Sequence, residues 1–300
     1  DIANNLLTKY KQSRQLEVEP VTREMLSLIV ESALSEKRVE KPQIHFDLSI
    51  TPDARLAFTD VSRIALKRVL SNLFNNAVES IPTTRAGRVC LSLTQENDRL
   101  NLTIRDNGCG MPDEVLKSVF ARGFSYDKSS GSGLGLYDAA QKIHALDGKI
   151  YLSSAVDVGS TVDITLPLKA PPPWFSSSVA LLPDQKVIIL DDEPYLHKVL
   201  DERFARLNQS GFNIQVSHYY QAASVISQFY HQPAFYLLDY ELKEQELTGL
   251  DVVSQLGIAD RALLVTNCFD DATLRERCVE MGLKLFPKIL LDSLQIVEKP

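Results

Sequence analysis

Two glycine clusters constrain the fold of this chain more than any other feature of its sequence. The first is Asp106-Asn107-Gly108-Cys109-Gly110, which follows an alternating apolar stretch at 100–104 that is typical of a strand with one buried face. A carboxylate at the buried end of a strand is a hydrogen-bond acceptor, and Gly108 and Gly110 let the backbone turn sharply beside it. We therefore expect Asp106 to hold an exocyclic amino group such as that of adenine.

The second cluster is Gly131-Ser132-Gly133-Leu134-Gly135, which opens an apolar-periodic helix expected to stop at Gly148. Glycines at a helix N-terminus expose backbone N–H groups and the positive end of the helix dipole, which suits a polyphosphate. The simpler alternative for either cluster alone is a pair of tight turns. Together the clusters indicate the base end and the phosphate end of one nucleotide.

A helix predicted over 61–81 carries a polar face opposite its apolar stripe. Asn72 and Asn76 lie one turn apart on that face. Asn is a poor helix former, and such a pair is ordinarily a solvated surface. Because the helix accompanies both glycine clusters, we interpret the pair as part of the same site.

In this order of motifs, residues 20–168 resemble the ATP-binding domain of sensor histidine kinases. The wider family includes the type II topoisomerase (gyrase), heat-shock-90 and MutL-type mismatch-repair ATPases. The matching boxes are 72–77, 106–110, 120–124, 131–136 and 159–161. The resemblance implies a two-layer α/β sandwich that binds ATP and Mg²⁺ through Asn72, Asn76, Asp106, Gly108, Gly110, Lys128, Gly131, Gly133, Gly135 and Thr161. By position, Asn76 would hold the ATP-bound magnesium and Lys128 would reach the terminal phosphate.

One position separates kinases from hydrolases in this comparison. The hydrolases resemble the same helix but carry a Glu one turn before the metal-binding Asn, where this chain has Asn72. An amide cannot take a proton from water, so we expect phosphotransfer rather than hydrolysis. An ATP hydrolase of the same fold remains the alternative.

Composition sets broad limits on the class of protein. The chain has 300 residues, 44% hydrophobic content and a net charge of −7, which suits two compact domains and gives no basic footprint for nucleic acid. Its four Cys form no C-x-x-C pair, which favours a reducing interior. No apolar run reaches membrane-spanning length, so we expect a cytoplasmic protein or the cytoplasmic part of a membrane-bound sensor.

The start of the chain suggests a fragment. Residue 1 is Asp rather than Met, and apolar spacing over 1–16 indicates the end of an amphipathic helix. The kinase resemblance makes residues 1–19 the end of a dimerisation helix. None of the five His stands in a His-Glu or His-Asp context on such a helix, so the phosphoacceptor His is expected upstream or in trans. A second amphipathic helix is predicted over 21–36.

The pattern breaks at 169–185, where Pro171-Pro172-Pro173 and three serines predict a linker. Trp174 and Phe175 within it are expected to dock on a domain, because exposed paired aromatics are disfavoured. Residues 186–300 then alternate apolar strands at 186–190, 213–217, 235–238, 262–265 and 283–286 with helices, which predicts a doubly wound (βα)5 sheet.

Polar residues follow the strands of this second half. Asp191, Asp192, Asp239, Thr266 and Lys288 all stand at expected carboxyl ends of strands. Converging carboxylates repel unless a divalent cation lies among them, and oxygen ligands suit magnesium. Over 186–299 the chain resembles a response-regulator receiver domain. The resemblance implies Asp239 as phosphoacceptor, Asp191 and Asp192 with Asp239 as magnesium ligands, and Thr266 and Lys288 as groups that contact the phosphate.

Three positions depart from the receiver pattern. The loop after Asp239 is longer than usual and has Lys243 in place of a Pro, Asn267 stands where Ala is common, and Ile289 replaces the Pro after Lys288. The resulting hypothesis is the catalytic core and receiver of a hybrid sensor histidine kinase, with relay to Asp239. Expected partners are a dimerisation and phosphoacceptor His domain, a downstream phosphotransfer protein or response regulator, and a second copy in the full-length homodimer. A nucleotide-binding scaffold with a degenerate receiver is a further alternative.

Overall fold

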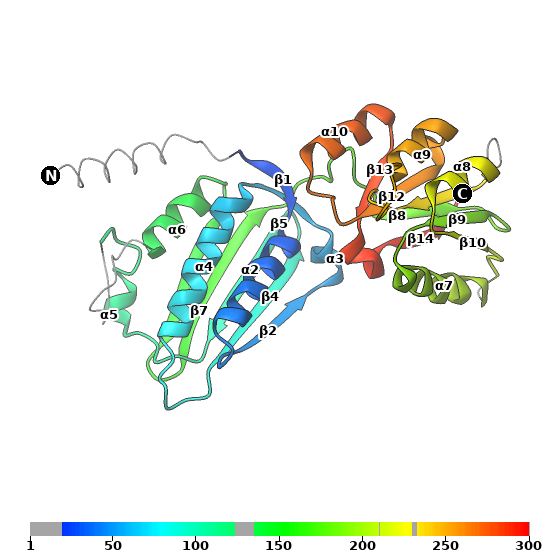
Figure 1. Cartoon of the computed structure of the whole chain (residues 1–300). Helices are drawn as coiled ribbons and strands as arrows, with labels where there is room; N and C mark the ends of the chain where they lie inside the picture. The colour runs from blue at the N-terminus through cyan, green and yellow to red at the C-terminus, as the bar shows by residue number, and fades with distance from the viewer. Residues whose placement is uncertain (1–19, 124–134, 210, 230–232, 300) are drawn as a thin grey trace. The chain divides into compact units, whose positions relative to one another are not determined.

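The computed structural model describes residues 20–123, 135–209, 211–229 and 233–299. Contacts divide the chain into two compact units, Asp1–Ala170 and Pro171–Pro300, which are coloured along the sequence in Figure 1. The predicted end of a dimerisation helix at 1–19 lies outside the described residues. Among those that are described, no helix is both long and apolar enough to cross a membrane.

The first unit is built on a five-stranded sheet with the order β2-β4-β5-β7-β6. β2 and β4 run parallel, and the other neighbouring pairs run antiparallel. The sheet is therefore mostly antiparallel. Its strands are β2 (His45–Ile50), β4 (Arg88–Glu96), β5 (Arg99–Asp106), β6 (Lys149–Ala155) and β7 (Gly159–Pro167).

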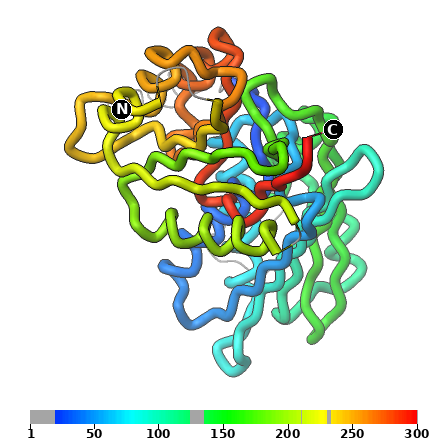
Figure 2. The backbone as a smooth tube through the Cα atoms, turned by 90° about the vertical axis from the view of Figure 1, so that its right-hand side faces the viewer, coloured from blue at the N-terminus to red at the C-terminus, as the bar shows by residue number. Residues whose placement is uncertain are grey.

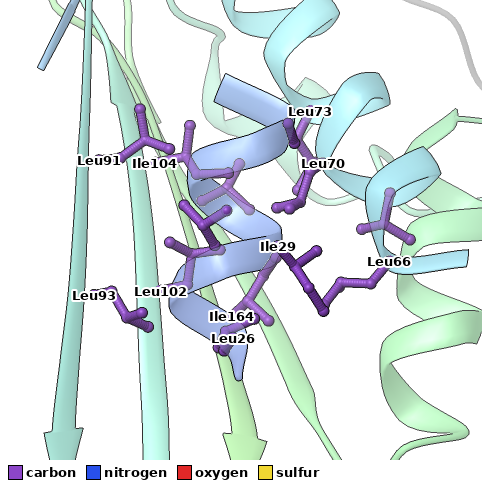
Figure 3. Packing of buried hydrophobic residues seen from close by; sticks show 14 of the residues in the cluster. Leu26, Ile29, Leu66, Leu70, Leu73, Leu91, Leu93, Leu102, Ile104 and Ile164 are labelled. Atoms are coloured by element: carbon purple, nitrogen blue, oxygen red, sulfur yellow. The ribbon is translucent and has the colours of Figure 1, made fainter. Parts of the chain in front are cut away.

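Helices cover one face of this sheet (Figure 1). They are α2 (Leu26–Glu40), α4 (Arg63–Glu79) and α6 (Gly135–His144), while α3 (Pro52–Arg55) and α5 (Asp113–Leu116) are single turns. Figure 3 shows the apolar stripes of α2 and α4 packed against alternate residues of β4, β5 and β7. Polar pairs such as Thr103 with Asp163, 2.7 Å from Oγ1 to Oδ1, occupy the alternate positions. The two-layer sandwich follows from this alternation.

The helix predicted over 21–36 begins later than expected. Thr22–Met25 forms a strand, β1, which pairs antiparallel with β3 (Phe58–Val61), and α2 starts at Leu26. Arg23 contributes to this pairing, because its Nε donates to Oδ1 of Asp60 at 2.9 Å. The short strand pair was missed because its partner lies far away in the sequence.

The second unit has a five-stranded parallel sheet with the order β10-β9-β11-β12-β13. An inner strand, β9, lies between β10 and β11 and is a continuous apolar run that is wholly buried from Val187 to Leu190, as expected of a parallel strand covered on both faces. The strands are β9 (Lys186–Leu190), β10 (Gln215–Tyr219), β11 (Phe235–Leu238), β12 (Ala262–Thr266) and β13 (Lys284–Pro287). The connecting helices are α7 (Pro194–Gln209), α8 (Ala222–Phe229), α9 (Gly249–Leu256), the short η1 (Ala259–Arg261), and α10 (Ala272–Met281).

The end of the second unit differs from a simple (βα)5 pattern. After β13, the described chain forms a 3₁₀ helix, η2 (Lys288–Ser293), and a strand, β14 (Gln295–Glu298). β14 pairs parallel with β8 (Ser178–Leu181), and the two segments can be followed in Figure 2. The apolar residues of 289–291 are consecutive rather than helically spaced, which does not favour a closing α-helix.

The predicted linker at 169–185 is in large part built into the second unit. Trp174 and Phe175 are each 6% exposed, which confirms that the two aromatics dock. The Phe175 ring stacks on Phe286 with 5.8 Å between centroids, and the Arg275 guanidinium lies 4.6 Å from the centre of the Trp174 ring. Burial of this aromatic surface outweighs the loosening effect of the neighbouring serines.

Candidate functional site

The carboxylate of Asp106 is held in a cradle of three donors. Its Oδ1 accepts from the backbone N–H of Gly108 at 2.8 Å, from the N–H of Ser160 at 3.2 Å and from the hydroxyl of Ser80 at 3.2 Å. Among the described residues all three bonds go to Oδ1, so Oδ2 is left as an acceptor for a ligand. Asp106 is 8% exposed, and burial raises its pKa although these donors oppose the shift.

Glycines around Asp106 are required by close backbone approach. A Cβ on Gly108 would lie 2.0 Å from Oγ of Ser80 and 2.8 Å from Oδ1 of Asp106. Gly110 has φ +65°, and a Cβ there would lie 1.9 Å from the carbonyl oxygen of Ala155. The first glycine box therefore keeps the backbone close against Asp106 and β6, and its spacing in the sequence anticipated this.

The asparagine-bearing helix lies beside the start of α6. A Cβ on Gly135 would be 4.0 Å from Cβ of Asn72, so the end of the second glycine box reaches α4. Asn72 and Asn76 are both partly exposed on α4. The neighbouring Asn75 has a different task, because its Oδ1 accepts from Nζ of the buried Lys37 at 2.8 Å and ties α4 to α2.

Thr161 does not join the Asp106 cradle. It pairs across the sheet with Arg105, and side chains that face each other across antiparallel strands point to the same face. Arg105 is exposed and Ile104 and Asp106 are buried, so Thr161 lies on the face opposite Asp106. The preceding residue, Ser160, supplies the contact instead.

Sequence reasoning also missed Ser80 and Arg85. Ser80 follows Asn76 by one helical turn, a spacing that could have identified it. Arg85 donates through Nη1 to the carbonyl oxygens of Asn107 at 2.7 Å and Gly108 at 3.0 Å, so it holds the backbone of the first glycine box in place. The remaining predicted residues Lys128, Gly131 and Gly133 lie outside the described residues.

A second site lies at the carboxyl ends of the parallel strands. Ligand oxygens of Asp191, Asp192 and Asp239 lie within 4.8 Å of one another. Nζ of Lys288 is 2.7 Å from Oδ2 of Asp191 and 2.8 Å from Oδ2 of Asp239. Four of the five predicted residues thus meet, and the donor set of carboxylate oxygens fits a magnesium ion.

The cluster of Asp191, Asp192, Asp239 and Lys288 is called the acidic pocket below, and its carboxylates and ammonium group shift one another's pKa. Burial raises the pKa of Asp191 to about 6 and also raises that of Asp239, although Lys288 opposes both shifts. Burial lowers the pKa of Lys288, but hydrogen bonds to Asp191 and Asp239 raise it overall to about 12. Thr266 is the fifth predicted residue; it is 1% exposed and its hydrogen bond to Asp239 lowers the pKa of that carboxyl.

The long loop after Asp239 is anchored in two places. Oε1 of Gln245 accepts from the N–H of Ala222 at 2.9 Å, and its Nε2 donates to the carbonyl of Tyr220 at 2.8 Å. Nζ of Lys243 reaches within 3.8 Å of carboxylate oxygens of both Asp192 and Glu193. The loop therefore brings a second ammonium group, that of Lys243, close to the acidic pocket.

Part of the first unit matches a known protein family. Residues 61–170 match the family model described as histidine kinase-, DNA gyrase B-, and HSP90-like ATPase. A probable C4-dicarboxylate sensor kinase of Halalkalibacterium halodurans is 35% identical over 103 residues, which are 34% of this chain and 19% of that protein. The histidine protein kinase SaeS of Staphylococcus epidermidis is 33% identical over 109 residues, 35% of this chain and 31% of SaeS.

Among solved structures, the mycobacterial sensor histidine kinase MprB is similar, with a TM-score of 0.44 and 25% identity over 50% of this chain and 98% of that one. The chain spans less than a third of the length of both curated relatives. Residues 61–170, which match the family model, contain α4, the Asp106 cradle and the start of α6.

Proposed function

We infer that this chain, whose residues 61–170 match the family model of histidine kinase-, DNA gyrase B-, and HSP90-like ATPases, transfers the γ-phosphoryl group of Mg-ATP to a histidine outside this chain. We propose further that its second unit is a receiver-like domain in which Asp239 accepts the phosphoryl group. The complete assembly is then a hybrid sensor kinase of a two-component pathway.

The Asp106 cradle is the observation that carries the first part. Three donors fix Oδ1, so Oδ2 can accept from the amino group of adenine, while the glycines let the backbone pack closely around Asp106. Asn76 is the residue we assign to the magnesium of ATP, which would neutralise phosphate charge. The chain's own contribution is binding and orientation, since transfer of this kind depends mainly on positioning and charge stabilisation.

Asn72 supports transfer over hydrolysis. It lies on α4 against Gly135, beside the proposed phosphate end of the pocket. A side-chain amide has no basic site at neutral pH, so Asn72 can orient a group but cannot activate water by taking its proton. The nucleophile is therefore expected to be an imidazole nitrogen from a dimerisation helix.

The acidic pocket supports the second part of the proposal. Its residues occupy the carboxyl edge of a parallel sheet, where open α/β sheets bind ligands. Asp239 is 6% exposed and lies against the Lys288 ammonium, so a phosphoryl group formed there would find a cation already in place. The departures at Lys243, Asn267 and Ile289 alter the surroundings of Asp239 but replace none of these groups.

The proposed partners follow from this chemistry. A His-bearing dimerisation hairpin supplies the first acceptor, and a second phosphotransfer protein or response regulator takes the group from Asp239. The kinase acts as a homodimer through that hairpin. Because the reaction consumes ATP, we place both units in the cytoplasm.

Transfer can be tested with ATP labelled at the γ-phosphate and a separately expressed two-helix hairpin that carries a His-Glu pair. Acid-labile, base-stable label on the hairpin that requires Asp106 is the expected result. Label appearing next on this chain, and absent from the Asp239→Asn variant, supports the relay.

Three outcomes oppose the proposal. Absence of ATP binding by calorimetry overturns the first part. Release of free phosphate without any labelled hairpin favours the hydrolase alternative. Labelled hairpin with no label on Asp239, from either the hairpin or acetyl phosphate, favours a scaffold whose second unit only regulates.

A further inference from the structure

A chain of hydrogen bonds runs from the surface of the second unit to the acidic pocket. Oδ1 of Asp201 lies 2.7 Å from Nε2 of His218. Nδ1 of His218 lies 2.7 Å from Nδ1 of His197, and Nε2 of His197 lies 2.8 Å from the carbonyl oxygen of Asp191. His197 and Asp201 are one turn apart on α7, and His218 reaches them from β10, where it pairs with Ile189 of β9.

The acceptor at one end fixes the direction of the bond to Asp191. A carbonyl oxygen only accepts, so Nε2 of His197 is the donor to the carbonyl of Asp191. In the contact between the two Nδ1 atoms, one imidazole donates and the other accepts. His197 is 4% exposed, so these contacts hold a buried ring.

His197 completes the fixation of the Asp191 backbone. The N–H of Asp191 donates to the carbonyl of Tyr219 at 3.1 Å, while its carbonyl accepts from His197. Its side-chain Oδ1 accepts from the N–H of Glu193 at 2.8 Å, so the direction of the carboxylate depends on this same turn. The Tyr220 ring packs on His197 with 4.5 Å between centroids and limits rotation of the imidazole.

We propose that His197 is a positioning residue for the acidic pocket: its Nε2–H aligns Asp191 for a divalent cation, and the His218–Asp201 pair holds its ring in that orientation. This inference rests on the proposed receiver-like function of the second unit and adds residues to which that proposal gave no role. Both ring nitrogens of His197 are committed, and one of them bonds the main chain of Asp191, which we propose as a metal ligand.

The test uses the full chain without nucleotide, with Mn²⁺ alone as the probe. Binding is followed by the electron paramagnetic resonance signal of free Mn²⁺, and Asp239→Asn identifies the pocket as the site. Loss of an outer hydrogen bond to a metal ligand typically weakens binding about 10–100-fold, so His197→Leu should raise the Mn²⁺ Kd by that factor, whereas His197→Gln should stay within about threefold of wild type. Gln keeps an N–H donor near the position of Nε2.

A second measurement does not depend on metal or on any variant folding. In protein labelled with ¹⁵N-histidine, the wild type should show a coupling across the hydrogen bond between the Nδ1 nuclei of His197 and His218. Absence of this coupling would overturn the hydrogen-bond chain.

The Mn²⁺ titration distinguishes a failure of the positioning role of His197 from a failure of the metal site proposed for the second unit. If the wild type binds Mn²⁺ and His197→Leu binds it equally well, the positioning role is wrong while the pocket stands. If the wild type binds no Mn²⁺ although the coupling between the two rings is present, the metal site proposed for the second unit is itself wrong, and the positioning role falls with it.

Discussion

The backbone N–H of Ser160 on β7 donates to Oδ1 of Asp106 on β5, at 3.2 Å and across 54 positions of the sequence. This bond joins the first glycine box to β7, the strand of that sheet that comes last in the chain. It also distinguishes the two oxygens of Asp106, because the bonds to this carboxylate within the described part of the chain go to Oδ1, and Oδ2 is the oxygen that we propose for the nucleotide. Several consequences can be measured.

Substitution of Asp106 by Asn should weaken ATP binding without lowering the stability of the fold. In Asp106→Asn the amide oxygen can take over the bonds to Oδ1, but the amide nitrogen then points a donor where adenine also presents one. We expect ATP affinity to fall by about 1–3 kcal/mol, measured by titration calorimetry. Asp113→Asn, at the start of α5, is the control, and equal affinity in wild type and Asp106→Asn would remove Asp106 from the pocket.

The pH dependence of ATP binding follows from the same carboxyl. Burial raises the pKa of Asp106 above the usual 3.8, so it takes up a proton at a higher pH than an exposed Asp and then loses its acceptor role. On acidification, ATP affinity of the wild type should therefore fall towards that of Asp106→Asn. Comparing the two at each pH cancels protonation of ATP itself, and a constant ratio down to pH 4 would contradict the assignment.

The free energy of unfolding should change with pH in the opposite direction to ATP affinity. Because the folded-state pKa of Asp106 is raised, its contribution to stability is full below the unfolded-state pKa and is lost as pH rises through the folded-state pKa. The ionised carboxylate thus opposes folding at neutral pH when no nucleotide is bound. Asp106→Asn is expected to be at least as stable as wild type at pH 7 by urea denaturation.

Gly108→Ala should abolish the pocket through a defined clash. The new Cβ would lie 2.0 Å from Oγ of Ser80 and 2.8 Å from its Cβ, so Ser80 and Asp106 must both move. We expect ATP binding to be undetectable in this variant and partly restored in the double variant Gly108→Ala with Ser80→Gly. Gly135→Ala is the steric control, since its nearest neighbour would be 4.0 Å away, and it should unfold at the same urea concentration as wild type.

Lys288 should be essential for the stability of the second unit. Its side chain is 7% exposed between Asp191 and Asp239, so Lys288→Met leaves two buried carboxylates without a counter-charge. The expected loss is about 3–5 kcal/mol in the free energy of unfolding. Added Mg²⁺ should recover part of this loss, because a divalent cation can replace the ammonium group.

A matched control for this variant is Lys284→Met. Nζ of Lys284 is exposed and donates to the carbonyl of Pro173, so its removal should cost only about 1 kcal/mol. Equal effects of the two substitutions would show that Lys288 does not balance the charge of the pocket.

Trp174 gives a direct report on the docked segment before β8. It is the single Trp of the chain and is 6% exposed, so its emission should be blue-shifted and should follow unfolding of the second unit. Trp174→Ala should lower the stability of that unit by about 3–5 kcal/mol, and Trp174→Phe by less, since it keeps most of the buried ring. A solvent-exposed emission spectrum in the folded wild type would contradict the docking.

Local patterns in the sequence were sufficient for the elements that depend on neighbouring residues. The continuous apolar run 186–190 marks β9, and 235–238 matches β11 residue for residue. The Asp106, Gly108 and Gly110 spacing anticipated the cradle because it reflects local backbone geometry, namely a strand end followed by a tight turn.

Contacts between distant segments were decided only by the tertiary structure. Strand register places Ser160 rather than Thr161 beside Asp106, and a shift of one residue reverses every side chain on a strand. The pairing of β8 with β14 and the meeting of His197 with His218 likewise join parts of the chain that carry no mutual signal in sequence. Residue types and their spacing thus determined the chemistry available to this protein, and the register of its strands decided which atoms meet, because hydrogen bonds depend on distances of a few ångströms that a linear pattern does not contain.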